Sequence, residues 1–171
     1  MKWITVPALL LAACLGCSDN KPGSGFSGDG AKYLLKEEPA EAQSVLDTRK
    51  KTKDGDDVVI VGRIGGRKDP WGSGQASFSL IDASLVPCSE IEGDNCDTPW
   101  DYCCDDPKRL LASMATVNIV DAQGDTVQTP ARELLGVKEL QTVVVRGKAK
   151  RDDKGNLTIL AMGLYVRADQ K

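Results

Sequence analysis

The sequence predicts a mainly β domain: a barrel of five strands with one or two short helices and a cysteine-rich insertion between the second and third strands. Three observations predict this fold. Short apolar runs alternate with polar residues at the period of two that half-buried strands show. Turns rich in Gly and Asp separate the runs, and glycines inside the first run are typical of bulges and barrel bends. A chain of 171 residues has room for one such domain and additional terminal segments.

The first residues have the pattern of an export signal. Lys2 precedes an apolar run that is shorter than the ~20 residues needed to span a bilayer, and small residues and a cysteine follow it. Leu11-Ala12-Ala13-Cys14 is a Leu-small-small-Cys box, so residues 1–17 resemble the signal peptide of a bacterial lipoprotein. The resemblance implies a lipid on Cys14, with Cys17 as the alternative because it would give a more usual signal length. It also implies a domain outside the cytoplasm, anchored to a membrane of the cell envelope.

Two segments separate this signal from the strands. Residues 18–30 are rich in Gly, Ser and Asp and cannot bury enough apolar surface to offset their ordering entropy, so they are predicted to form a flexible tether. Residues 31–56 are predicted to form a helical extension. Its helix, over residues 39–51, begins at a proline, carries acidic residues at its start and ends in a basic cluster.

Residues 57–171 contain the predicted strands. These are Val58–Gly66, Ala76–Asp82, Ala115–Asp121, Thr142–Arg151 and Leu157–Val166. A short helix follows the third strand, starting at Thr129-Pro130 and ending at Gly136. Three strands, a helix and two more strands, with glycine in the first strand, resemble the OB-fold barrel over residues 57–167. The resemblance lies in topology, and closure of the barrel removes exposed strand edges.

The insertion, residues 83–107, holds all four cysteines outside the signal: Cys88, Cys96, Cys103 and Cys104. Between Pro87 and Pro107 there are also seven carboxylates and no basic side chain. An even set of cysteines in an oxidising compartment predicts disulfides. Because pairing of the adjacent Cys103 and Cys104 is strained, two patterns stay open: Cys88–Cys103 with Cys96–Cys104, or Cys88–Cys104 with Cys96–Cys103. Each disulfide would stabilise the insertion by ~3 kcal/mol.

The alternative for the same four cysteines is a metal-binding or thiol-redox protein outside the cytoplasm. Their spacing, C-x7-C-x6-C-C, lacks the closely spaced pairs of zinc knuckles. It also lacks the C-x-x-C pair of thiol oxidoreductases. The disulfides are therefore the first prediction and the metal or redox site the second.

The absence of histidine limits the function. It removes Ser-His-Asp and Cys-His catalysis and every His-ligated zinc site, so the sequence predicts a non-catalytic binding or structural module without a cofactor. A net charge of −3 and the lack of a basic groove with stacking aromatics predict no nucleic-acid partner. The expected partners are the membrane, through the lipid, and an envelope protein or glycan. Trp71, Trp100 and Tyr102 are predicted to line that contact.

Overall fold

The computed structural model describes Met1 and residues 28–168. The rest of the signal, both candidate lipidation sites Cys14 and Cys17, and residues 18–27 of the predicted tether lie outside the described residues. The predictions for them stay predictions. Among the described residues, no helix is long and apolar enough to cross a bilayer.

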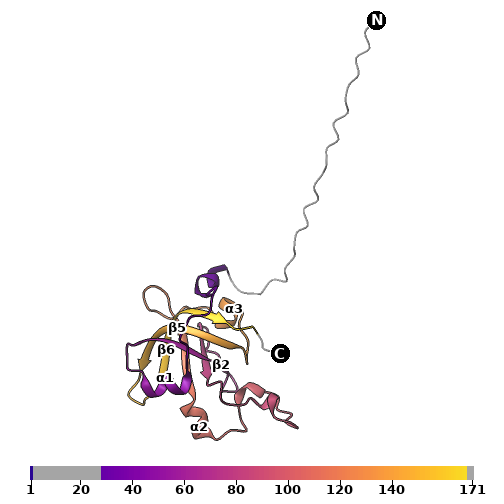
Figure 1. Ribbon diagram of the computed structural model, residues 1–171, viewed down its shortest axis with the longest axis vertical. Coiled ribbons are helices and arrows are strands. Elements are labelled where there is room, and N and C mark those ends of the chain that lie inside the picture. The colour runs from indigo at the N-terminus through magenta and orange to yellow at the C-terminus, as the bar shows by residue number, and fades with distance from the viewer. Residues whose placement is uncertain (2–27, 169–171) are drawn as a thin grey trace.

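The strands form one mixed sheet that closes into a barrel (Figure 1). In chain order they are β1 (Gln43–Ser44), β2 (Asp57–Ile64), β3 (Ser77–Ile81), β4 (Met114–Ile119), β5 (Thr142–Arg151) and β6 (Leu157–Val166). Their order in the sheet is β1-β2-β3-β4-β6-β5, and β2 also pairs with β5 to close the ring. β4 and β6 are parallel, whereas the other neighbours around the ring are antiparallel. This five-stranded Greek-key barrel, with the short β1 added beside β2, confirms the predicted OB fold.

The helices that flank the strands are short. They are η1 (Gly28–Tyr33), α1 (Val45–Lys51), η2 (Cys88–Glu90), η3 (Pro99–Asp101), α2 (Pro107–Ala112) and α3 (Ala131–Leu135). Figure 1 shows η1 and α3 near one end of the barrel, and α2 with the rest of the segment between β3 and β4 near the other. The insertion therefore lies between the second and third barrel strands, as the sequence predicts.

Aliphatic side chains fill the barrel because alternate residues of each strand point inward. Along β5, Val143, Val145 and Ala149 are buried while Arg146 and Lys148 are exposed. Burial of one large aliphatic side chain contributes about 1.5–3 kcal/mol, so the set of inward residues supplies most of the driving force for closure. A second, smaller hydrophobic cluster lies outside this core and is formed by Ile81, Leu85, Tyr102 and Met114.

Gly62 marks the point where β2 changes partners. β2 pairs with β5 from Asp57 to Arg63, and with β3 only at its last two residues. A Cβ at Gly62 would lie 2.6 Å from the Ile81 carbonyl oxygen, so only glycine permits the strands to approach this closely. The interpretation of glycine in the first strand as a barrel bend agrees with this position.

The N-terminal extension differs from its predicted form. The helix begins at Val45 rather than at residue 39, with Ser44 as N-cap and its hydroxyl accepting a hydrogen bond of 3.1 Å from Asp47 N–H. The preceding residues run extended, and β1 pairs in parallel with Ile60 and Val61 of β2. This long-range pairing overrides the helical pattern that a proline and nearby acids gave to the segment.

Candidate functional site

The insertion is fixed to the barrel by one buried aromatic side chain. Tyr102 follows η3 in the left-handed backbone conformation, with φ of 57°, and its side chain is 1% exposed. Its ring packs in the second hydrophobic cluster, against residues from β3 and the start of β4. The left-handed turn directs Tyr102 inward while the cysteines on either side of η3 remain nearer the surface.

Backbone contacts add a second attachment beside Tyr102. The Gly66 N–H donates to the Trp100 carbonyl at 2.7 Å, and the Trp100 indole N–H donates to the Lys68 carbonyl at 3.1 Å. A Cβ at Gly65 would lie 2.6 Å from the Trp100 carbonyl oxygen. The segment after β2 therefore needs glycine so that η3 can lie directly on it.

One ion pair and a helix cap hold the two ends of the insertion. Arg63 of β2 pairs with Glu90 of η2 at 2.9 Å. At the other end, the Asp106 carboxylate accepts hydrogen bonds from the Lys108 and Arg109 N–H groups, both at 3.0 Å, and so caps α2. The segment between these contacts, which carries Cys96, Cys103 and Cys104, is therefore attached at both ends.

The four sulfurs converge in a chain of close neighbours. Cys88 Sγ lies 3.8 Å from Cys103 Sγ and 3.7 Å from Cys104 Sγ. Cys96 Sγ lies 3.6 Å from Cys103 Sγ. All four are free thiols in the structure. Cys88 is buried and Cys96 half-buried, whereas Cys103 and Cys104 are exposed, so the cluster opens to solvent on one side.

Two carboxylates join the sulfurs. Asp94 accepts the Cys96 N–H at 2.8 Å, and Asp101 accepts the Cys103 N–H at 2.9 Å, so each aspartate bonds to the backbone two residues ahead. This turn places each carboxylate beside a thiol. One oxygen of Asp101 and the sulfurs of Cys88, Cys96 and Cys103 all lie within 4.8 Å of one another, as do the ligand atoms of Cys88, Asp94 and Cys104.

Hydrogen bonds raise the pKa of the two exposed thiols. The pKa of Cys103 is well above its ordinary value because of hydrogen bonds with Cys96 first, then Cys88 and Asp101. The pKa of Cys104 is raised to about 11, chiefly by its hydrogen bond to Asp94. These hydrogen bonds favour the protonated thiols, so nucleophilic exchange and metal binding, which both need a thiolate, first require the loss of these protons.

The three aromatic residues predicted to line a contact do not form one surface. Trp71 packs at the edge of the barrel core, where its ring is tilted against that of Phe78 with the ring centroids 6.2 Å apart. Its indole N–H donates a hydrogen bond of 2.9 Å to the Glu139 carboxylate. Tyr102 belongs to the separate second cluster and is buried, so the prediction that it lines an exposed contact is wrong. Trp100 is half-buried, and its indole N–H is bonded to the Lys68 carbonyl.

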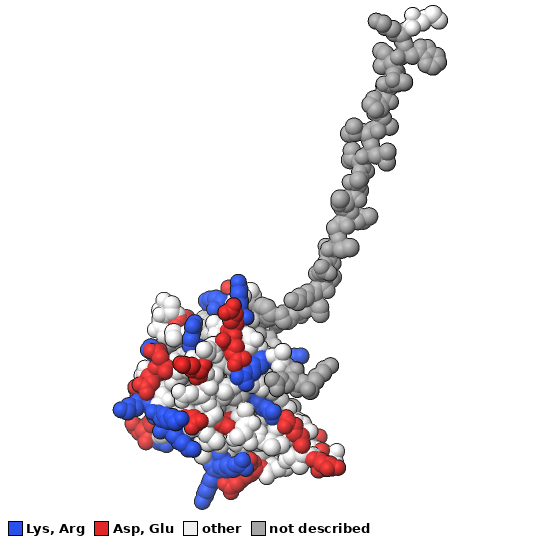
Figure 2. Space-filling view, in the orientation of Figure 1, with Lys and Arg blue, Asp and Glu red and all other residues white. Residues whose placement is uncertain are grey.

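Sequence reasoning missed the roles of Asp94 and Asp101. It counted seven acids in the insertion and gave none of them a separate role, and Figure 2 does show acidic side chains at the outer end of the insertion. The available signal was the repeated spacing of an aspartate two residues before Cys96 and again before Cys103. That spacing, and not the acidic content alone, separates the two carboxylates at the sulfurs from the rest.

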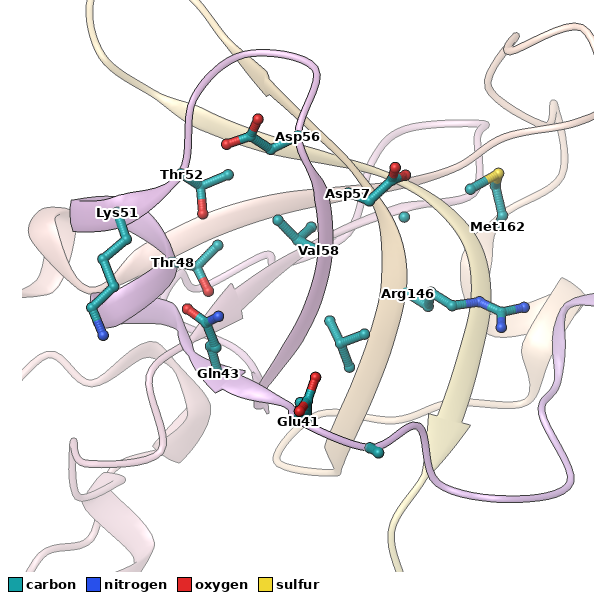
Figure 3. A pocket seen from close by; sticks show the side chains of 13 residues that line it. Glu41, Gln43, Thr48, Lys51, Thr52, Asp56, Asp57, Val58, Arg146 and Met162 are labelled. Atoms are coloured by element: carbon teal, nitrogen blue, oxygen red, sulfur yellow. The ribbon is translucent and has the colours of Figure 1, made fainter.

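A groove on another part of the molecule lies between α1, the extended segment before it, and strands β2 and β5 (Figure 3). Its volume is about 610 Å³, and Figure 3 shows Glu41, Gln43 and Lys51 along one wall and Arg146 beside Met162 on the other. The acids and bases near it neutralise one another: Asp57 pairs with Lys148 at 2.8 Å. The groove brings no thiols or unpaired buried polar groups together, so the insertion is the stronger candidate site.

Comparison with known proteins gives a fold neighbour and no family. No protein-family model and no curated protein matches the chain. Among solved structures, the chain is similar to the telomere capping protein Ten1 from Saccharomyces pombe, with 15% sequence identity and a TM-score of 0.31. The match covers 72% of this chain and 75% of the other.

This neighbour corrects one prediction. The sequence predicted that nucleic acid is not a partner, yet the OB-fold protein to which the chain is similar caps telomeres. The exclusion of nucleic acid, which was drawn from charge and composition alone, conflicts with this neighbour and is withdrawn. At this identity the likeness itself concerns only the fold.

Proposed function

We propose that the chain is a lipid-anchored protein of a bacterial cell envelope and acts as a non-catalytic binding module, with the insertion as its binding element. The observation that carries this proposal is the convergence of four sulfurs, contributed by three separate parts of the insertion, at neighbour distances of 3.6–3.8 Å. Thiols held together on a rigid barrel are a preorganised set of donor atoms.

The remaining titratable groups support a non-catalytic role. The chain has no histidine. Outside the insertion, the buried Asp82 carboxylate accepts hydrogen bonds from the backbone N–H groups of Leu46 and Ser84, at 2.8 and 2.9 Å. A carboxylate that is buried and engaged in this way stabilises the fold and is not exposed to a substrate.

The export signal supports the envelope address. Leu11-Ala12-Ala13-Cys14 resembles a lipoprotein box, and the fold is a small barrel that needs no further subunit to close. Disulfides among the four cysteines fit the same compartment and stay the alternative prediction, because a sulfur in a disulfide is no longer a thiol donor. A disulfide would require two sulfurs to close to ~2.05 Å, and both pairing patterns remain open.

Lipidation of the full chain in a bacterial host tests the anchor. With radiolabelled palmitate, the wild-type protein is expected to carry label and to enter the detergent phase, whereas Cys14→Ser is expected to lose both. Cys17→Ser is the matched control and should keep them. Loss of label from Cys17→Ser instead of Cys14→Ser would move the lipid to the alternative site, and an unlabelled, cytoplasmic wild-type protein would contradict the proposal.

A further inference from the structure

We propose that the insertion binds one divalent cation of the Zn²⁺ type through the thiolates of Cys88, Cys96 and Cys103 and the carboxylate of Asp101. This inference rests on the proposed function and deepens it by naming the class of ligand. Thiolate and carboxylate donors without histidine suit a cation of borderline softness, which accepts both sulfur and oxygen.

The distances between sulfurs are those of ligands around one ion. A Zn–S bond is ~2.3 Å, so two sulfurs at corners of a tetrahedron around zinc lie about 3.8 Å apart. Cys88 Sγ and Cys103 Sγ are 3.8 Å apart, and Cys96 Sγ and Cys103 Sγ are 3.6 Å apart. With the Asp101 oxygen, these atoms lie within 4.8 Å of one another, which gives the four donors of a tetrahedral site.

The same distances also contain one pairing pattern. Cys88–Cys104 at 3.7 Å and Cys96–Cys103 at 3.6 Å share no sulfur, and together they are one of the two predicted disulfide patterns. Cys88 and Cys103, at 3.8 Å, are neighbours as well, and a shared ion accounts for this third contact, which that pattern leaves unused. The intact mass of the native protein distinguishes the two arrangements.

Hydrogen bonds orient the oxygen donor. Asp101 accepts the Cys103 N–H on one oxygen at 2.9 Å and the Thr98 hydroxyl on the other at 2.8 Å. Each carboxylate oxygen has two lone pairs, so one per oxygen remains for a cation. Partners of this kind fix the orientation of metal ligands in known sites and raise their affinity.

Charge also favours a cation here. The stretch from Pro87 to Pro107 has no basic side chain, and the arginines that contact the insertion pair with Glu90 and Asp105 rather than with Asp94 or Asp101. On binding, the three thiols release their protons to solvent, and the ion compensates the resulting negative charge.

Cys104 lies outside the proposed donor set. Its thiol donates to Asp94 at 3.0 Å, and its sulfur neighbours Cys88 but does not belong to the group with Cys96, Asp101 and Cys103. Cys104→Ser should therefore lower Zn²⁺ affinity less than Cys103→Ser does. The comparison distinguishes this site from a site of four thiolates.

The test uses the full chain, purified from membranes in detergent without reductant or chelator. Elemental analysis is expected to give one zinc per chain, and intact mass after acid release to match four free thiols. In titration of the metal-free protein with Zn²⁺ against a chromophoric chelator, Asp101→Asn is expected to weaken binding at least tenfold and Cys103→Ser by more. Asp97→Asn, which removes an exposed acid of the same insertion that belongs to neither donor group, is the matched control and should change nothing.

Several results would overturn the proposal. A mass lower by four hydrogens means two disulfides, even if the reduced protein later takes up Zn²⁺. Four free thiols without Zn²⁺ binding, or equal losses in Asp97→Asn and Asp101→Asn, would also contradict it. The lipid anchor is tested separately. A lipidated chain that binds no metal overturns only this inference. A chain that binds metal but carries no lipid overturns only the proposed anchor.

Discussion

Asp82 shows how one buried residue joins distant parts of the chain. Its side chain is 2% exposed at the end of β3, and one carboxylate oxygen accepts the Leu46 N–H at the start of α1 while the other accepts the Ser84 N–H. Burial by itself would raise the pKa of Asp82, but these hydrogen bonds outweigh it and hold the pKa below its ordinary value. The ionised form is therefore the one that stabilises the fold.

Replacing Asp82 by Asn should lower the free energy of unfolding by about 1–3 kcal/mol at pH 7, because the amide oxygen can accept only one of the two N–H bonds and the amide nitrogen cannot accept the other. The wild-type contribution is complete above the unfolded-state pKa of about 3.9 and is lost as pH falls through the lower folded-state pKa. In urea unfolding, the free energy of unfolding should therefore fall less between pH 7 and pH 3 for Asp82→Asn than for the wild type. Asp153→Asn, an exposed control, should follow wild type, and parallel acid profiles for all three proteins would refute the role of Asp82.

Gly65 is the second residue whose identity the structure dictates. Gly65→Ala would put a Cβ 2.6 Å from the Trp100 carbonyl oxygen, so η3 must move away from the barrel. We expect a loss of about 1–3 kcal/mol in unfolding free energy, as in other overpacked sites. Gly28→Ala meets no atom within 4 Å and should be neutral. Chemical denaturation measures both, and equal stability of the two variants would show that the close approach is not required.

At the scale of elements, periodicity predicted the barrel strands because inward and outward positions alternate along each of them. β3, β5 and β6 lie within one residue of their predicted bounds, and α3 ends at Gly136 in the left-handed conformation that a C-terminal glycine predicts. The start of α1 was not predictable locally, because the segment before it pairs with Ile60 and Val61 of β2. The residues around the start of α1 do not indicate that a strand distant in the sequence will pair with this segment.

The docking of η3 gives a prediction at this scale. Among the described residues the buried Tyr102 hydroxyl has no hydrogen-bond partner, and burial raises the pKa of Tyr102 although the nearby Arg63 guanidinium offsets part of the rise. Tyr102→Phe removes an unsatisfied polar group and should leave the free energy of unfolding unchanged or raise it by about 1 kcal/mol. Tyr102→Ala should lower it by about 3 kcal/mol, because it leaves a cavity in the second hydrophobic cluster. A loss in Tyr102→Phe, measured by urea unfolding, would mean that the hydroxyl is bonded after all.

At the scale of the whole molecule, the candidate site was only half visible in the sequence. The four cysteines identified the insertion, whereas Tyr102 and Trp100, which attach it to the barrel, were predicted to line a contact with a partner. The partition of the acids was not predicted: Asp94 and Asp101 bond to backbone N–H groups at the sulfurs, whereas Asp105 and Asp106 act at α2. The spacing of an aspartate two residues before a cysteine was a signal for the first pair, but the path of the loop that brings the sulfurs together has no periodic pattern and does not follow from composition.

The separation of the two hydrophobic clusters leads to the last prediction. The main core fills the barrel, whereas Ile81, Leu85, Tyr102 and Met114 support the insertion. Because local stability follows local packing, loading the metal-free chain with Zn²⁺ should slow amide exchange in residues 83–107 and leave β5 and β6 nearly unchanged. Hydrogen exchange read by mass spectrometry measures both regions in one sample, and Cys103→Ser should abolish the effect. Uniform slowing across the barrel would instead mean that Zn²⁺ acts on global stability, and the insertion would then not be an independently ordered binding element.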